Sequence, residues 1–154
     1  MVMKKIIHRR LHFVKYLLIL LLLTACGTSS SEDPALTRYR DDMAACTESI
    51  ENIAASIDAI DPAAEDASSE LLSAVDRMRD AFKDMAGLSA PAAYSSAAAL
   101  ATEAATLMSD CSTLYHTAYD GGSYDSLSAE QARKQYENAM QRLSSIAEIF
   151  METK

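Results

Sequence analysis

Histidine is the side chain most often used for metal binding and proton transfer, and His116 is the one histidine that follows residue 12. Helical di-iron sites use Glu-x-x-His pairs, and the sequence contains none. It also lacks the Cys-x-x-Cys-His motif of covalent haem attachment, the nucleophile elbow of hydrolases and glycine-rich phosphate loops. Because His116 flanks an apolar stripe, we expect a surface histidine. We expect no catalytic residue, no metal site and no cofactor, and therefore no enzyme.

Cys46 and Cys111 are thiols on the apolar faces of predicted helices. Two cysteines in an oxidising compartment favour a disulfide. Helix geometry argues against the bond, because it places Cys46 roughly 21 Å and Cys111 roughly 5 Å from the same end of the expected bundle. A disulfide needs Cα atoms within about 7 Å of each other. A disulfide and two buried free thiols therefore stay open as alternatives.

Tyrosine, glycine, serine and aspartate gather around one predicted loop, between residues 115 and 125. Four of these residues are candidates for a binding tip: His116, Tyr119, Asp120 and Tyr124. The composition is typical of recognition loops, in which tyrosine supplies contact area and small residues supply adaptability. An acidic, tyrosine-bearing end could dock a basic or peptide ligand. The alternative is that these residues only cap helices and turn the chain.

A basic segment precedes an unbroken apolar run at the N-terminus. Lysines and arginines occur between Lys4 and Lys15, and residues 17–23 are all leucine or isoleucine. The uncharged stretch from Tyr16 to Ala25 is shorter than the about 20 apolar residues that span a bilayer. A cleaved signal peptide is therefore favoured over a transmembrane anchor.

The residues Leu23, Thr24, Ala25 and Cys26 resemble the lipobox of bacterial lipoproteins, in which a leucine and two small residues precede a cysteine. The resemblance implies that residues 1–25 are a lipoprotein signal peptide and that Cys26 carries lipid on its sulfur as the mature N-terminus. Residues 26–33 then form the lipidated cysteine and a flexible tether. This resemblance covers residues 1–26 only, and we identify no family for the body. The alternative is an ordinary secretory signal that leaves Cys26 as an exposed thiol.

The body beyond the signal is strongly acidic. The whole chain has 14 basic and 22 acidic side chains and a net charge of −8. The residues before Cys26 include lysines and arginines but no aspartate or glutamate, so removal of the predicted signal leaves a body that is more negative than the whole chain. A body this acidic repels phosphate backbones, which excludes nucleic-acid binding. It is also not attracted electrostatically to an anionic membrane.

Apolar residues then recur with helical spacing, most clearly three and four positions apart from Leu36 to Ile60. The predicted helices cover residues 34–60, 62–86, 90–119 and 128–152. We expect Asp33 and Asp61 to cap the first two helices, Gly87 to end the second, and Ser128 with Gln131 to form a capping box for the last. The first turns of the second helix are weakly apolar, so its start could also lie nearer Ser69.

This pattern predicts an all-α fold, an antiparallel up-down-up-down four-helix bundle over residues 34–154. A coiled-coil hairpin that dimerises is the alternative, and the oligomeric state stays open. We expect an exported protein that is anchored by lipid on Cys26 to the outer face of the cytoplasmic membrane or to the outer membrane. Its expected role is a non-enzymatic interaction or scaffold module of the cell envelope with an unidentified protein or peptide partner. A small-ligand or metal-binding bundle and an inhibitor or immunity-type lipoprotein are the alternatives.

Overall fold

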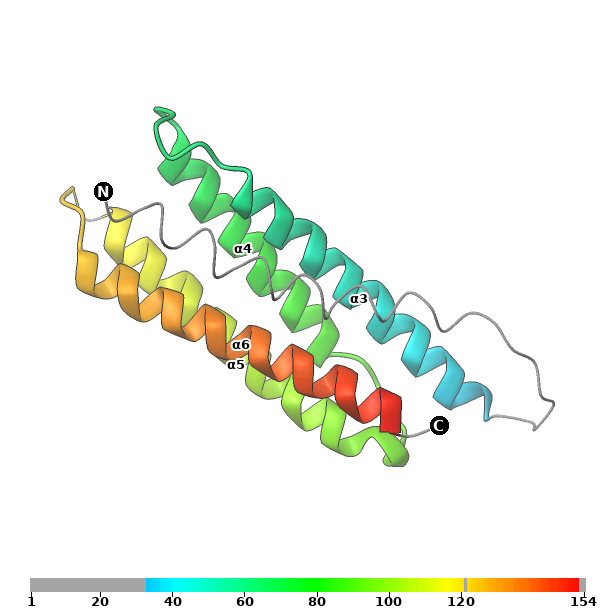
Figure 1. Cartoon of the computed structure of the whole chain (residues 1–154). Coiled ribbons are helices and arrows are strands. Elements are labelled where there is room, and N and C mark those ends of the chain that lie inside the picture. The colour runs from blue at the N-terminus through cyan, green and yellow to red at the C-terminus, as the bar shows by residue number, and fades with distance from the viewer. Residues whose placement is uncertain (1–32, 121, 153–154) are drawn as a thin grey trace. The chain divides into compact units, whose positions relative to one another are not determined.

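The computed structural model describes residues 33–120 and 122–152, which contain four α-helices, one 3-10 turn and no strand. The helices are α3 (Pro34–Asp58), α4 (Ala67–Ala86), α5 (Ser95–Asp120) and α6 (Ser126–Glu152), and the turn η2 (Ala92–Tyr94) precedes α5. Successive helices run in opposite directions in Figure 1, and contacts join α3 to α4, α4 to α5 and α5 to α6. The predicted all-α four-helix bundle is confirmed for these residues. The predicted signal peptide, Cys26 and the tether up to residue 32 lie outside the described residues.

The first helix begins where the sequence predicts. The backbone N–H of Ala35 donates to Asp33 Oδ1 at 2.9 Å, and Pro34 occupies the first helical position, where no N–H is needed. The helix ends at Asp58 rather than at residue 60. Proline at position 62 disfavours helical geometry in the residue before it, which helps to end α3 early.

The predicted start of the second helix at residue 62 is wrong. Asp61 caps a turn instead, because the backbone N–H of Ala63 donates to Asp61 Oδ1 at 3.0 Å and that of Ala64 to the Asp61 carbonyl at 3.1 Å. The helix begins at Ala67. Residues 61–63, 65 and 66 are exposed, so a helix there would bury no apolar face. Gly87 follows the last residue of α4 as predicted, with a right-handed φ of −78°.

The boundaries of the last two helices also differ from the prediction. Extended backbone at Pro91 and a hydrogen bond from the Tyr94 N–H to the Pro91 carbonyl make η2, so the α-helix starts at Ser95 rather than at residue 90. The capping box at Ser128 is wrong. Asp125 Oδ1 accepts from the backbone N–H of Leu127 at 3.0 Å, and the Ser128 hydroxyl donates to Asp125 Oδ2 at 2.7 Å, so α6 begins at Ser126.

Apolar side chains from all four helices form one core, and its α5 and α6 members are largely alanine. Small side chains let two helix backbones approach closely. Of the predicted stripe from Leu36 to Ile60, three residues of α3 are buried (Tyr39, Met43 and Ile50), four others of α3 pack against the core, and Ile60 lies beyond the end of the helix. The buried core residues are Tyr39, Met43, Ile50, Val75, Met78, Phe82, Met85, Tyr94, Ala97, Ala101, Ala104, Met108, Cys111, Ala132, Ala139, Leu143 and Ile146.

Three aromatic rings join α3, η2 and α6 at the end of the bundle where α3 begins. The ring centroids of Tyr39 and Tyr94 are 5.6 Å apart and stacked, and the ring of Phe150 lies 4.8 Å from that of Tyr94. The Arg40 guanidinium lies over the Tyr94 ring, and its Nε donates to the Tyr94 hydroxyl. The connections from α3 to α4 and from α5 to α6 both lie at the opposite end (Figure 1).

Candidate functional site

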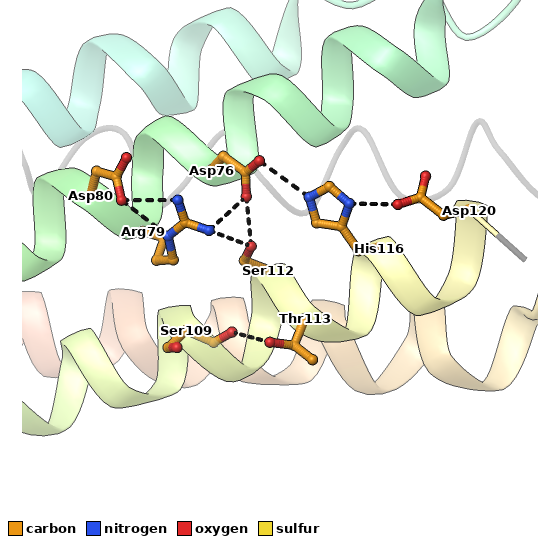
Figure 2. Close-up of polar contacts among 8 residues, drawn as sticks. All are labelled: Asp76, Arg79, Asp80, Ser109, Ser112, Thr113, His116 and Asp120. Carbon is orange, nitrogen blue, oxygen red and sulfur yellow. Dashed lines mark hydrogen bonds and ion pairs between the residues drawn. The ribbon is translucent and has the colours of Figure 1, made fainter.

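A polar network crosses the interface between α4 and α5, and Figure 2 shows its members. Asp76 on α4 is its centre. Its Oδ1 accepts hydrogen bonds from the Ser112 hydroxyl at 2.7 Å and from Arg79 Nη1 at 3.0 Å, and its Oδ2 lies 3.2 Å from His116 Nε2. On the other side of the imidazole ring, Nδ1 lies 2.7 Å from Asp120 Oδ2. The His116 side chain is 39% exposed, as expected of a surface histidine, but its ring also bridges two helices, which the sequence interpretation missed.

Helix periodicity explains why these side chains meet. Ser112, His116 and Asp120 are spaced four residues apart on α5 and therefore share one face. Asp76 and Arg79 are three residues apart on the facing helix. Ser112 is only 2% exposed, and its hydrogen bond to Asp76 compensates for the cost of burying a hydroxyl.

The network favours the charged forms of His116 and Asp76. Hydrogen bonds to Asp120 and then to Asp76, with the negative charge of both, raise the pKa of His116 above its ordinary value. Burial opposes ionisation of Asp76, but hydrogen bonds from Ser112 and His116 and the charges of His116 and Arg79 outweigh it and lower the pKa of this carboxyl. Two oppositely charged groups thus stabilise each other across the helix interface.

The connectivity differs from that of a hydrolytic triad. The Ser112 hydroxyl donates to Asp76 and not to His116, so the imidazole is not placed to take its proton. Ser112 is also buried, which leaves its oxygen without access for a substrate. Within the described ranges, no group of three His, Cys, Asp or Glu side chains is arranged to hold a metal ion. The contacts from Asp76 to Ser112 and His116 join α4 to α5.

The predicted tip residues Tyr119 and Tyr124 lie together where α5 connects to α6. Their ring centroids are 5.3 Å apart, and the ring of Tyr115 lies 6.4 Å from that of Tyr119. Burial, the neighbouring phenol and a hydrogen bond with Tyr124 raise the pKa of Tyr119. Tyr119 is thus half-buried, and the ring of Tyr124 packs against it. We use "the tip" below for residues 119, 120 and 122–127.

Two large apolar side chains of the tip face solvent. Tyr124 is 62% exposed and Leu127 is 64% exposed, and in the part of the chain that the structure describes only Met151 joins them among exposed large apolar residues. The sequence interpretation missed Leu127, which lies at the start of α6 and does not belong to the apolar stripe of that helix. Its position outside that stripe was the available signal.

The end of the bundle that carries the tip is rich in carboxylates. The sequence has no lysine or arginine between Arg40 and Arg77 or between Lys83 and Arg133, and both helix connections at this end fall within these gaps. Acidic residues of this end are Asp58, Asp61, Glu65, Asp66, Glu70, Asp120, Asp125 and Glu130. A surface of one charge sign attracts ligands of the opposite sign.

Cys46 and Cys111 are free thiols in the structure, as in the second of the two predicted alternatives, but only Cys111 is buried. Cys46 is half-buried near the carboxylates of Asp84 and Asp42, whereas Cys111 is buried and hydrogen bonds to the backbone of Tyr136. Burial raises the pKa of Cys111 to about 12. The candidate lipidation site Cys26 lies outside the described residues.

The sequence matches no protein-family model, and comparisons with curated proteins and with solved structures found no significant match. None of the described helices is both long enough and apolar enough to cross a membrane.

Proposed function

We propose that this protein is a lipid-anchored, non-enzymatic interaction module of the bacterial cell envelope, whose tip docks a lysine- or arginine-rich segment of another envelope protein. In this proposal, acyl chains on Cys26 hold the protein at a membrane surface, and the four-helix body presents the tip to its partner. Each buried CH₂ group contributes about 0.8 kcal/mol to such anchoring.

The observation that carries the docking proposal is the exposure of Tyr124 and Leu127 at an end where the described residues include no lysine or arginine. Exposed aromatic and aliphatic side chains supply contact area, and the carboxylates around them select a cationic partner. Because Tyr119 packs beneath Tyr124, the exposed ring is held in place before binding, which lowers the entropic cost of association.

The docking proposal is tested with a defined probe, a short acetylated and fluorescein-labelled peptide of lysines around one phenylalanine. Replacing both exposed residues, Tyr124→Ser with Leu127→Ser, is expected to weaken binding about tenfold, because it removes apolar area that binding buries. Met151→Ser is the matched control, since Met151 is also exposed (48%) but lies near the end of α6, away from the tip. Equal binding by wild type and the double variant would refute the proposed docking surface.

A second peptide tests the role of charge. A peptide with glutamates in place of the lysines is expected not to bind, and added salt is expected to weaken binding of the lysine peptide. Circular dichroism of the double variant checks that it folds, and an unchanged unfolding midpoint is expected because both replaced side chains are exposed.

The anchor is tested separately from the tip. When the whole chain is expressed in bacteria with radiolabelled palmitate, label is expected in the wild-type protein and not in Cys26→Ala. Label in the alanine variant, or none in either protein, would refute lipidation at Cys26 and leave the docking proposal to its own test.

A further inference from the structure

His116 occupies a position that favours the protonated imidazole ring. Both of its ring nitrogens face carboxylate oxygens, Nδ1 toward Asp120 and Nε2 toward Asp76 (Figure 2). Ionised carboxylates only accept hydrogen bonds, so both nitrogens need a proton to make these contacts. A neutral ring keeps one N–H and turns a lone pair toward the other carboxylate.

The charged groups around the ring come from α4 and α5. On α4 they are Asp76, which contacts the ring, and Arg79, which is held by ion pairs with Asp76 and with the more distant Asp80. On α5 the facing group is Asp120, whose side chain is 61% exposed. Among the described residues, the ion pairs and hydrogen bonds of His116 go to these two helices. His116 is thus the one basic side chain of α5, and it lies four residues before Asp120 of the tip.

We infer that His116 couples proton binding to docking at the tip, so that affinity for a lysine- or arginine-rich segment rises when the ring loses its proton. This inference rests on the proposed function and adds a regulation to it. A proton on His116 offsets part of the negative charge that attracts the partner, and Asp120, which contacts the ring, is itself exposed. Removing that proton makes the end more negative by one charge.

Deprotonation changes the charge while leaving the shape of the tip intact. The nearer contact is the one to Asp120, at 2.7 Å, and a neutral ring that keeps its Nδ1–H preserves it within α5. Asp76 keeps its hydrogen bonds from Ser112 and Arg79, so α4 and α5 stay joined. The contact between Tyr119 and Tyr124 does not involve the imidazole ring. Electrostatics therefore decides the direction of the effect.

Thermodynamic linkage makes the coupling reciprocal. If losing the proton raises affinity for the cationic peptide by a given factor, the bound peptide lowers the affinity of His116 for its proton by the same factor. The interaction between two unit charges about 4 Å apart in water is large enough to change a binding affinity about fivefold.

The experiment measures binding of the lysine–phenylalanine peptide to the whole chain in a nonionic detergent, by fluorescence anisotropy at constant ionic strength. Acetylation removes the peptide amino group that would otherwise titrate in the same range. Between about pH 5.5 and about pH 8.5, wild-type affinity is expected to rise about fivefold. His116→Gln, which is neutral throughout, is expected to bind at the wild-type alkaline affinity at every pH. His116→Lys, which stays charged, is expected to bind weakly at every pH.

Nuclear magnetic resonance supplies the reciprocal measurement. The imidazole signal that is missing from His116→Gln belongs to His116, and its titration midpoint is expected to move to lower pH when the peptide is bound. A midpoint that does not move, or wild-type binding that is independent of pH, would overturn the coupling and leave docking at the tip standing. Absence of binding at every pH would overturn both proposals.

Discussion

The buried hydroxyl of Tyr39 has no hydrogen-bond partner among the described residues, and removing it is expected to stabilise the protein. Tyr39 is 3% exposed, and its hydroxyl oxygen is buried. Burying an unsatisfied hydroxyl costs about 1–3 kcal/mol. Phenylalanine keeps the ring and its contacts with Tyr94 and Phe150, at centroid distances of 5.6 Å and 6.1 Å. We therefore expect Tyr39→Phe to raise the free energy of unfolding by about 1 kcal/mol.

Tyr94 offers a matched control that is expected to change stability in the opposite direction. Its ring stacks on that of Tyr39 and is fully buried, but its hydroxyl accepts a hydrogen bond from Arg40. Tyr94→Phe removes the same single oxygen atom, loses that bond and is expected to lower the free energy of unfolding by about 1 kcal/mol. Equilibrium denaturation in urea measures both values, with equal m-values showing that the unfolded states are comparable.

The comparison of the two variants is decisive because they share residue type, helix-end environment and lost volume. A loss of stability in Tyr39→Phe similar to that in Tyr94→Phe would show that the Tyr39 hydroxyl is hydrogen bonded in solution. The physical account of this aromatic cluster would then be wrong. A gain in Tyr39→Phe together with a loss in Tyr94→Phe would support it.

Packing and titration lead to three further predictions. Ala104→Leu overfills the core and is expected to lower the free energy of unfolding by about 1–3 kcal/mol, whereas Ala99→Leu on the exposed face of α5 changes it little, as urea denaturation would show. Cys111, with its pKa raised to about 12, is expected to resist iodoacetamide at about pH 8 until the protein is denatured, when mass spectrometry finds it alkylated along with Cys46. Folding raises the pKa of His116, so the protonated ring stabilises the folded protein below the ordinary histidine pKa of 6.5, and this stabilisation is lost as pH rises through the pKa of the folded state. The unfolding midpoint of wild type is therefore expected to fall over this pH range relative to that of His116→Gln.

The four helices could be predicted because each has a continuous apolar stripe, and burial of such a stripe in tertiary packing stabilises a helix. Their ends were harder to predict, since an aspartate followed by proline caps a helix at Asp33 and only a turn at Asp61. The two sites differ in the residues after the proline, because apolar residues that reach the core come directly after Pro34 but only several residues after Pro62. Capping chemistry alone therefore does not identify a helix start.

The network between α4 and α5 was not predicted, because Asp76 and His116 are 40 residues apart and neither belongs to a recognised motif. A signal was nevertheless present in the helix register. Asp76 follows the buried Val75, and Ser112 follows the buried Cys111, so each polar residue lies at the margin of a core stripe on neighbouring helices. Polar residues at such margins on two adjacent helices are expected to face each other. Their partners can be found by placing the two helices side by side, antiparallel, and comparing which residues lie at the same height.

The tip shows how structure changes the choice of residues even where the sequence indicated the right region. Tyr119 and Tyr124 were equal candidates by composition, yet Tyr119 packs between two other tyrosine rings and Tyr124 projects into solvent. Replacing Tyr119 would remove packing as well as any contact with a partner, and a loss of binding would then have two explanations. Tyr124 and Leu127 have little packing to lose, because each is more than half exposed. Because Tyr124 also contacts the Tyr119 ring, a binding defect on replacing these two side chains reports on the partner interface when the unfolding midpoint is unchanged.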